Sequence, residues 1–193
     1  MAIRIQDKER KVYIGKVKRF ARSKKGQAII RRFVSSEIIK LLEEHPEYLD
    51  IHQFYSDPRV CGNYLITLFE DKDWYTGESG NVLLRACEHI YNMLTSDCFG
   101  GIIDKNVPAR IEVIAWGVTD PKLRRLFEAC VVEARKPYMQ FTDPASEEYG
   151  SDKFVPEGEN RETLRADATI KIDLRRKRFE QAKKQYLEKL KEH

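Results

Sequence analysis

The chain of 193 residues is long enough for one domain with a hydrophobic core and an appendage, and two full domains are not expected. Hydrophobic residues make up 41% and charged residues 34%, which is more apolar content than a disordered chain would have. No apolar run approaches the roughly 18 residues of a membrane span, and residues 1–11 lack the apolar region of a signal peptide. We therefore expect an intracellular, soluble (cytoplasmic) protein without a membrane span.

The net charge of +4 hides an uneven distribution of charge along the chain. Residues 1–33 carry 12 basic and 2 acidic side chains, for +10, whereas residues 34–150 carry 11 and 20, for −9. Residues 151–193 carry 12 and 9, for +3. An acidic middle between two basic ends is informative about binding partners and says little about the fold.

Residues 1–25 are predicted to form a basic strand pair or arm. Apolar and polar residues alternate at residues 2–5 and again at residues 11–20, on either side of the turn-like sequence DKER. The period then changes, because apolar residues recur at helical spacing over about 27–45 and the run stops at Pro46. This second segment predicts the first helix.

Two further helices are predicted in the middle of the chain. Asp57 followed by Pro58 is typical of a helix start, and the expected apolar positions of this helix are Cys61, Leu65 and Leu68. Ser79 is expected to cap the next helix, whose apolar side contains Val82, Leu83, Ala86, Cys87, Ile90, Met93 and Leu94.

The segment at residues 107–118 fits both helical and strand periods. We prefer a helix, and the alternative is a strand through Ile111, Val113 and Ala115. Asp120 and Pro121 then begin another helix that stops at Pro137. Its apolar stripe consists of Leu123, Leu126, Phe127, Cys130, Val131 and Ala134.

The predicted fold class is mainly α, a compact bundle of about five short helices over residues 26–137. The basic N-terminal strand pair or arm precedes this bundle. A linker or loop at residues 138–160, with no sustained periodicity, leads to a separate, basic amphipathic C-terminal helix within residues 161–193.

The basic N-terminal third is the strongest indication of function. Long cationic side chains reach phosphates, and the interleaved Tyr13, Phe20 and Phe33 would stack on unpaired bases if they were exposed. The candidate nucleic-acid-binding residues here are Lys16, Lys18, Arg19, Arg22, Lys24, Lys25, Arg31 and Arg32. The alternatives are that these cations bind an acidic protein partner, the chain's own acidic middle, or an anionic membrane surface.

The C-terminal segment carries a second basic cluster and an apolar stripe. Arg175, Arg176 and Arg178 are further candidates for nucleic-acid contact, although consecutive residues lie on different sides of a helix and cannot all face one groove. The apolar stripe is expected to dock on a partner helix or on the body of the protein. It consists of Phe179, Ala182, Tyr186 and Leu190.

No catalytic or metal-binding signature is specific. Residues 73–81, DWYTGESGN, lack the Lys of a phosphate-binding loop and the second Gly of a nucleophile elbow. Cys87 and His89 are two residues apart, so on a helix they cannot share one ion. The four cysteines are scattered, which favours free thiols in a reducing compartment. We expect neither a metal nor a cofactor.

The leading functional hypothesis is a non-enzymatic, nucleic-acid-associated protein that contacts the phosphate backbone of DNA or RNA through its basic N-terminal arm. The alternative is a structural subunit of a homo-oligomer or larger assembly, whose basic termini and C-terminal helix dock on neighbouring chains. An enzyme of unknown class is the third hypothesis.

Overall fold

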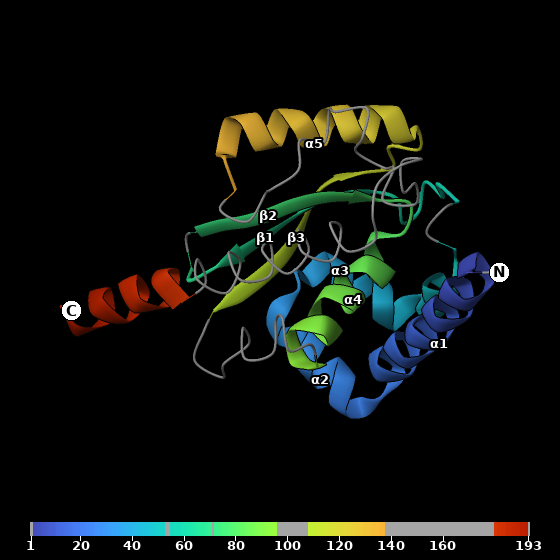
Figure 1. The fold of residues 1–193 in the computed structure, drawn as a ribbon, viewed down its shortest axis with the longest axis horizontal. Helices are drawn as coiled ribbons and strands as arrows, with labels where there is room; N and C mark the ends of the chain where they lie inside the picture. Colours follow the sequence, from blue (N-terminus) through green and yellow to red (C-terminus); the bar gives the residue numbers. More distant parts are fainter. Residues whose placement is uncertain (1, 53–54, 71, 96–107, 138–179, 193) are drawn as a thin grey trace.

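The computed structural model describes residues 2–52, 55–70, 72–95, 108–137 and 180–192 (Figure 1). Within these residues a three-stranded antiparallel sheet lies in the middle of the chain, in the order β2-β1-β3. The strands are β1 (Gly62–Leu68), β2 (Lys72–Ser79) and β3 (Ala109–Trp116). The predicted fold class, a mainly α bundle of about five short helices behind a basic N-terminal strand pair or arm, is therefore wrong.

Helices cover both faces of the sheet. One face carries α5 (Pro121–Arg135), which lies across β1 and β2 on the outside of the molecule (Figure 1). The other face packs against α4 (Val82–Thr95) and, beside β3, against α2 (Lys24–Phe33). The sheet is thus the middle layer, and the main hydrophobic core lies between it and α4.

The strand β1 occupies residues that were predicted to be helical. Tyr64, Ile66 and Leu68 are buried on the α4 side, and Leu65 is buried on the opposite side with Asn63, whose side chain bonds to α5. A strand that is covered on both faces has no alternation of polar and apolar residues. The helical spacing of its apolar residues was therefore accidental, and the second predicted helix is wrong.

The segment whose apolar spacing fitted both a helix and a strand forms the strand β3. Ile111 pairs with Ile66 and Val113 pairs with Tyr64, so the preferred helix is wrong and the strand alternative is confirmed. The chain just before the third helix covers the outer edge of β3, because Ser35 N donates to Ile111 O at 2.9 Å. A covered edge has fewer open backbone groups to pair with another chain.

The N-terminal strand pair is replaced by one long helix, α1 (Ala2–Arg22). Val17 and Ala21 are buried, with Tyr13 and Phe20 partly buried beside them, which is the i, i+3, i+4 spacing of an amphipathic helix. Apolar and polar residues alternate near the start of this segment, which is a pattern that also fits a strand. The helix forms instead, because its packing against α4 buries one continuous apolar stripe.

The first predicted helix is split in two. α2 ends at Phe33, Val34 and Ser35 are extended, and α3 (Ser36–Glu44) follows. A short 3-10 helix, η1 (Pro46–Asp50), begins at the predicted stop. The backbone bond from Ser35 to β3 explains the break, because this residue cannot continue the helix while it pairs with a strand.

The predicted helices at α4 and α5 are confirmed. The cap of α4 is Asn81 instead of Ser79, since Asn81 Oδ1 accepts from Leu84 N at 3.0 Å. Asp120 caps α5 by accepting from Lys122 N at 2.8 Å, with Pro121 at the first helical position. Residues 180–191 form a further helix at the C-terminus.

The elbow between α1 and α2 depends on a glycine. Ser23 Oγ donates to Phe20 O at 2.8 Å and accepts from Gly26 N at 2.9 Å, which folds the start of α2 against the end of α1. A Cβ at Gly26 would lie 1.8 Å from Phe20 O, whereas a Cβ at Gly15 would meet nothing within 4 Å.

Replacing Gly26 by Ala is therefore expected to lower the free energy of unfolding by about 1–3 kcal/mol, because the elbow must open. The matched change Gly15→Ala, in α1, should raise it by about 0.5–1 kcal/mol through helix propensity. Urea unfolding of the two variants measures both effects. A loss of stability in Gly15→Ala as large as in Gly26→Ala would contradict this account of the elbow.

Candidate nucleic-acid interface

The eight N-terminal candidate cations lie on two consecutive helices that meet at Ser23. We call them the α1–α2 basic surface. All of their side chains are exposed or partly exposed to solvent. The α1–α2 basic surface consists of Lys16, Lys18, Arg19, Arg22, Lys24, Lys25, Arg31 and Arg32.

The cations of α1 do not share one face of the helix. At about 100° per residue, Lys18 and Arg22 fall on one flank of the buried stripe, Lys16 falls on the other, and Arg19 points outward. From the sequence alone, we predicted that these cations form a single basic arm. The helix instead distributes them, so a flat ligand could contact only part of the set at once.

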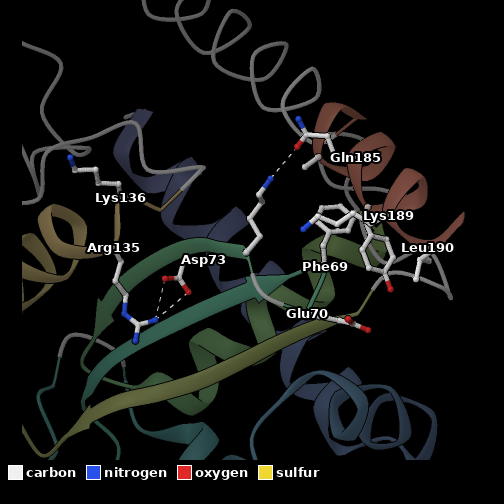
Figure 2. A pocket seen from close by; sticks show the side chains of 11 residues that line it. Phe69, Glu70, Asp73, Arg135, Lys136, Gln185, Lys189 and Leu190 are labelled. Carbon is white, nitrogen blue, oxygen red and sulfur yellow. Dashed lines mark hydrogen bonds and ion pairs between the residues drawn. The ribbon is translucent and has the colours of Figure 1, made fainter. Parts of the chain in front are cut away.

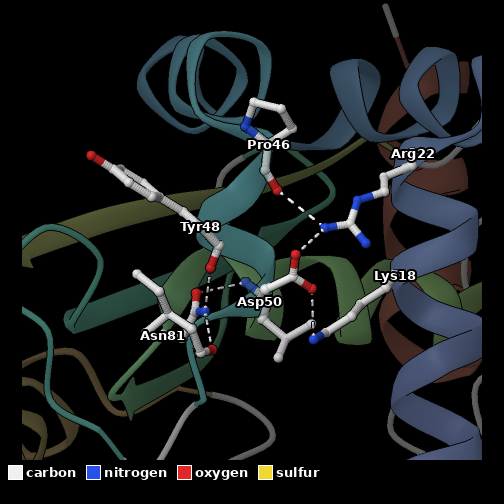
Figure 3. Close-up of polar contacts among 8 residues, drawn as sticks. Lys18, Arg22, Pro46, Tyr48, Asp50 and Asn81 are labelled. Carbon is white, nitrogen blue, oxygen red and sulfur yellow. Dashed lines mark hydrogen bonds and ion pairs between the residues drawn. The ribbon is translucent and has the colours of Figure 1, made fainter.

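Two of these cations are held by the chain's own acidic middle (Figure 3). Lys18 Nζ donates to Asp50 Oδ1 at 3.0 Å, and the Arg22 guanidinium donates to Asp50 Oδ2 at 2.7 Å and to Pro46 O at 3.4 Å. The hydrogen bond from Lys18, with that from Arg22, lowers the pKa of Asp50. Since the Asp50 side chain is 58% exposed, each pair is of the surface kind, worth about 0–1 kcal/mol.

Asn81 positions the acidic partner of these cations. Its side-chain amide donates to Tyr48 O and to Ile51 O, both at 2.8 Å, and so ties η1 to the start of α4 (Figure 3). Asp50 lies between these two carbonyls in the chain. Sequence reasoning missed both Asn81 and Asp50, because nothing local marks a contact between segments about 30 residues apart.

The two arginines near the end of α2 also have partners within the chain. Arg31 forms an ion pair with Glu43 of α3. The Arg32 guanidinium lies over the Phe33 ring, 5.3 Å from its centroid, in a cation–π contact. Both remain exposed, so each is still within reach of a ligand.

Three lysines of the α1–α2 basic surface stand apart from these pairs. Among the described residues, no ion pair or hydrogen bond engages the side chains of Lys16, Lys24 and Lys25. Within the same described residues, Arg19 donates only to a carbonyl of its own helix, Gly15 O at 3.4 Å. Along the chain, Lys16 and Arg19 lie within two helical turns before the elbow at Ser23, and Lys24 and Lys25 follow it directly.

The aromatic residues between the cations are used inside the protein. Phe33 is buried, and the Phe20 ring packs edge-on against Tyr91 with centroids 5.5 Å apart. The Tyr13 hydroxyl donates to Asn92 Oδ1 at 2.7 Å. None of the three rings is therefore placed to stack on a base.

The C-terminal candidates divide into two groups. Arg175, Arg176, Arg178 and Phe179 lie outside the described residues. Ala182 is buried in the core, and the Tyr186 ring lies 5.4 Å from Phe69, whereas Leu190 is 55% exposed. The apolar stripe was predicted to dock either on a partner helix or on the body of the protein. The contacts of Ala182 and Tyr186 are those of a helix docked on the body of the protein.

A groove of about 540 Å³ lies between this C-terminal helix and the ends of β2 and α5 (Figure 2). Arg135 donates to both oxygens of Asp73 at 3.1 and 3.2 Å, and Lys72 Nζ donates to Gln185 Oε1 at 3.3 Å. These contacts link the walls of the groove to each other. It is best explained as the joint at which the C-terminal helix docks.

A polar cluster inside the core has groups typical of acid–base chemistry. The Tyr64 hydroxyl and His89 Nε2 are 2.8 Å apart, and Arg85 donates to Tyr64 Oη at 3.4 Å and to Glu88 Oε2 at 3.0 Å. Burial, followed by the nearby Arg85 charge, holds the pKa of His89 well below its usual value. Tyr64 is 1% exposed, whereas Arg85 and His89 are partly exposed at the edge of the cluster.

In the described part of the chain, no three His, Cys, Asp or Glu side chains are grouped closely enough to hold an ion. Within the same residues, no helix combines the length and the apolar character needed to cross a bilayer.

Comparison of the chain with protein-family models, with curated proteins and with solved structures finds no match.

The lowered pKa of the partly buried His89 imidazole predicts a pH dependence of stability. The unfolded chain takes up a proton at His89 near pH 6.5, and the folded chain does so only at lower pH. Below about pH 6.5 the free energy of unfolding should therefore fall, by at most about 1.4 kcal/mol per pH unit from this residue. Urea unfolding at a series of pH values measures the slope.

The His89→Gln variant should lose this part of the slope, while replacement of the exposed His52 by Gln should leave it unchanged. If His89→Gln and the unchanged protein lost stability equally between about pH 6.5 and 5.5, the imidazole would not be the group responsible.

Proposed function

We propose that this protein binds the phosphate backbone of nucleic acid through the α1–α2 basic surface, without catalysis. The observation that carries the proposal is a set of four exposed cations on the two helices that meet at the elbow, Lys16, Arg19, Lys24 and Lys25. The three lysines have no partner in the described part of the chain. Lysines and arginines of this kind provide the sequence-independent part of nucleic-acid affinity.

The charges at the start of α2 add to this support. Lys24 and Lys25 occupy the first turn of α2, which contains no acidic residue. The partial positive charge of a helix N-terminus disfavours cations there and favours anions. A phosphate near Ser23 would offset the repulsion between the two lysines and the helix N-terminus. The elbow therefore favours the binding of an anionic ligand.

The burial of the aromatic rings narrows the mode of binding. With Phe20 and Phe33 packed inside, stacking on unpaired bases has no support from this surface. We therefore expect contacts to the backbone and little sequence preference. The alternative of an assembly joined through the C-terminal helix has less support, since Ala182 and Tyr186 pack on the chain itself.

The first test replaces Lys16, Lys24 and Lys25 together by Gln. If these lysines each contact one phosphate, affinity for duplex DNA should fall for all sequences alike. The slope of log K against log salt should become less steep by about 2.7, at 0.9 per contact. Fluorescence anisotropy over a salt series measures both quantities.

The control for this test is the triple variant of Lys40, Lys136 and Lys191 to Gln. It has the same net charge, and its changes are spread over exposed positions on other parts of the protein. It should keep a steeper slope than the first variant. Equal losses in the two triple variants, or binding that does not respond to salt, would remove the proposal.

The second test releases two further cations. Asp50→Asn removes the carboxylate that holds Lys18 and Arg22, so binding to duplex DNA should become tighter by about threefold to tenfold. Glu47→Gln changes the net charge equally, but Glu47 pairs with His45 and not with α1. A gain in affinity that is the same for both variants would show a general effect of charge and not release of these two side chains.

A further inference from the structure

The helix α5 packs on the sheet with its polar side. Arg124 and Glu128 are among the most buried charged residues of the described chain, at 3% and 0% exposure. The apolar residues on the other side of the helix are open to solvent: Leu123 is 55% exposed, Leu126 59% and Phe127 39%. An amphipathic helix normally has the opposite orientation.

Hydrogen bonds to Arg124 set this orientation. Its guanidinium donates to Glu78 Oε2 at 2.6 Å, to Ser56 Oγ at 3.0 Å, and to the carbonyls of Val118 and Thr119 at 2.8 and 3.0 Å. The side-chain amide of Asn63 donates to the backbone carbonyl of Arg124 at 2.9 Å. Rotation of α5 to bury the apolar side would carry Arg124 away from these partners and leave the Glu78 carboxylate, which is only 19% exposed, without its ion pair. Breaking a pair of this kind is destabilising, because the remaining charge is poorly solvated.

The outcome is a continuous apolar patch on the outer side of α5, which we call the α5 stripe. It consists of Leu123, Leu126, Phe127 and Cys130, spaced i, i+3, i+4 and i+7. Of the eight large hydrophobic residues exposed in the described chain, three fall within the five positions from 123 to 127. Two others, Leu187 and Leu190, lie on the C-terminal helix, and the remaining three are scattered. A contiguous patch of this kind marks an interaction surface.

The charges beside the α5 stripe indicate which partner fits. Lys122 and Glu133 are both exposed and are eleven residues apart, which is close to three full turns of a helix. They therefore lie on the same edge of the stripe, at opposite ends of it. If a second copy of α5 packs antiparallel to the first, Lys122 of each copy lies beside Glu133 of the other. In parallel packing about a two-fold axis, this edge of one copy would lie across the interface from the same edge of the other, so neither pair would form.

We propose that the α5 stripe is the interface of a symmetric homodimer, in which two copies of α5 pack antiparallel about a two-fold axis. The same patch then serves both subunits, as an isologous interface requires. In this register Leu126 of one copy lies near Cys130 of the other. Figure 1 shows α5 on the outside of the described part of the molecule, with its outer side turned away from the sheet.

The size of α5 sets the expected affinity. Its 15 residues span about 22 Å, so pairing through this helix alone buries less area than a standard protein interface. We expect a dissociation constant on the order of micromolar. The proposal does not depend on nucleic-acid binding, because the α5 stripe and the α1–α2 basic surface are separate.

Sedimentation velocity of the full chain, without nucleic acid and across the micromolar range, tests the proposal. The protein should pass from monomer to dimer as concentration rises. Leu126→Glu should give a monomer, whereas Leu187→Glu, an equally drastic change at an exposed leucine of the C-terminal helix, should dimerise as before. A protein that stays monomeric throughout, or equal behaviour of these two variants, would overturn the proposal.

Charge reversal tests the antiparallel arrangement itself. Lys122→Glu and Glu133→Lys should each raise the dissociation constant by about tenfold, because each places like charges together twice in the symmetric dimer. The double variant K122E/E133K restores opposite charges and should dimerise as the unchanged protein does. If the double variant stays as weak as the single ones while its circular dichroism is unchanged, antiparallel pairing is wrong.

Discussion

The hydrogen bonds of Asn81 hold together the part of the fold that carries the proposed function. One side chain caps the central helix α4 and also donates to two carbonyls of η1. Because Asn81 is fully buried, these bonds are protected from water and an unpaired amide would be costly. They place Asp50 against α1, where it holds Lys18 and Arg22 and leaves the cations at the elbow exposed.

The two faces of the sheet are stabilised by different kinds of interaction. On the α4 side, apolar residues such as Ile66, Leu83 and Ile90 form a continuous core, whose burial is the main source of stability. On the α5 side, the central contact is an ion pair between Arg124 and Glu78 with further hydrogen bonds. These polar contacts between the sheet and α5 fix the rotation of α5 about its own axis. The apolar stripe of α5 is exposed as a result. The molecule thus offers a cationic surface and an apolar surface on different elements.

The sequence predicts those elements whose signals are local. The start of α5 follows from Asp120 and Pro121, and α4 follows from its long helical period. The strand β1 was missed because it is buried on both faces, a property that depends on which helices cover it. Partners such as Asp50 and the inward orientation of Arg124 were also missed, because both depend on residues that are distant in the chain.

The most direct test of the central claim, that exposed cations at the α1–α2 elbow bind nucleic acid, is ultraviolet cross-linking of the protein purified at low salt. We predict an absorbance ratio that reveals co-purifying nucleic acid, its removal by high salt, and cross-linked peptides that fall within residues 11–32. Protein that is free of nucleic acid at low salt, or cross-links confined to other segments, would contradict the account.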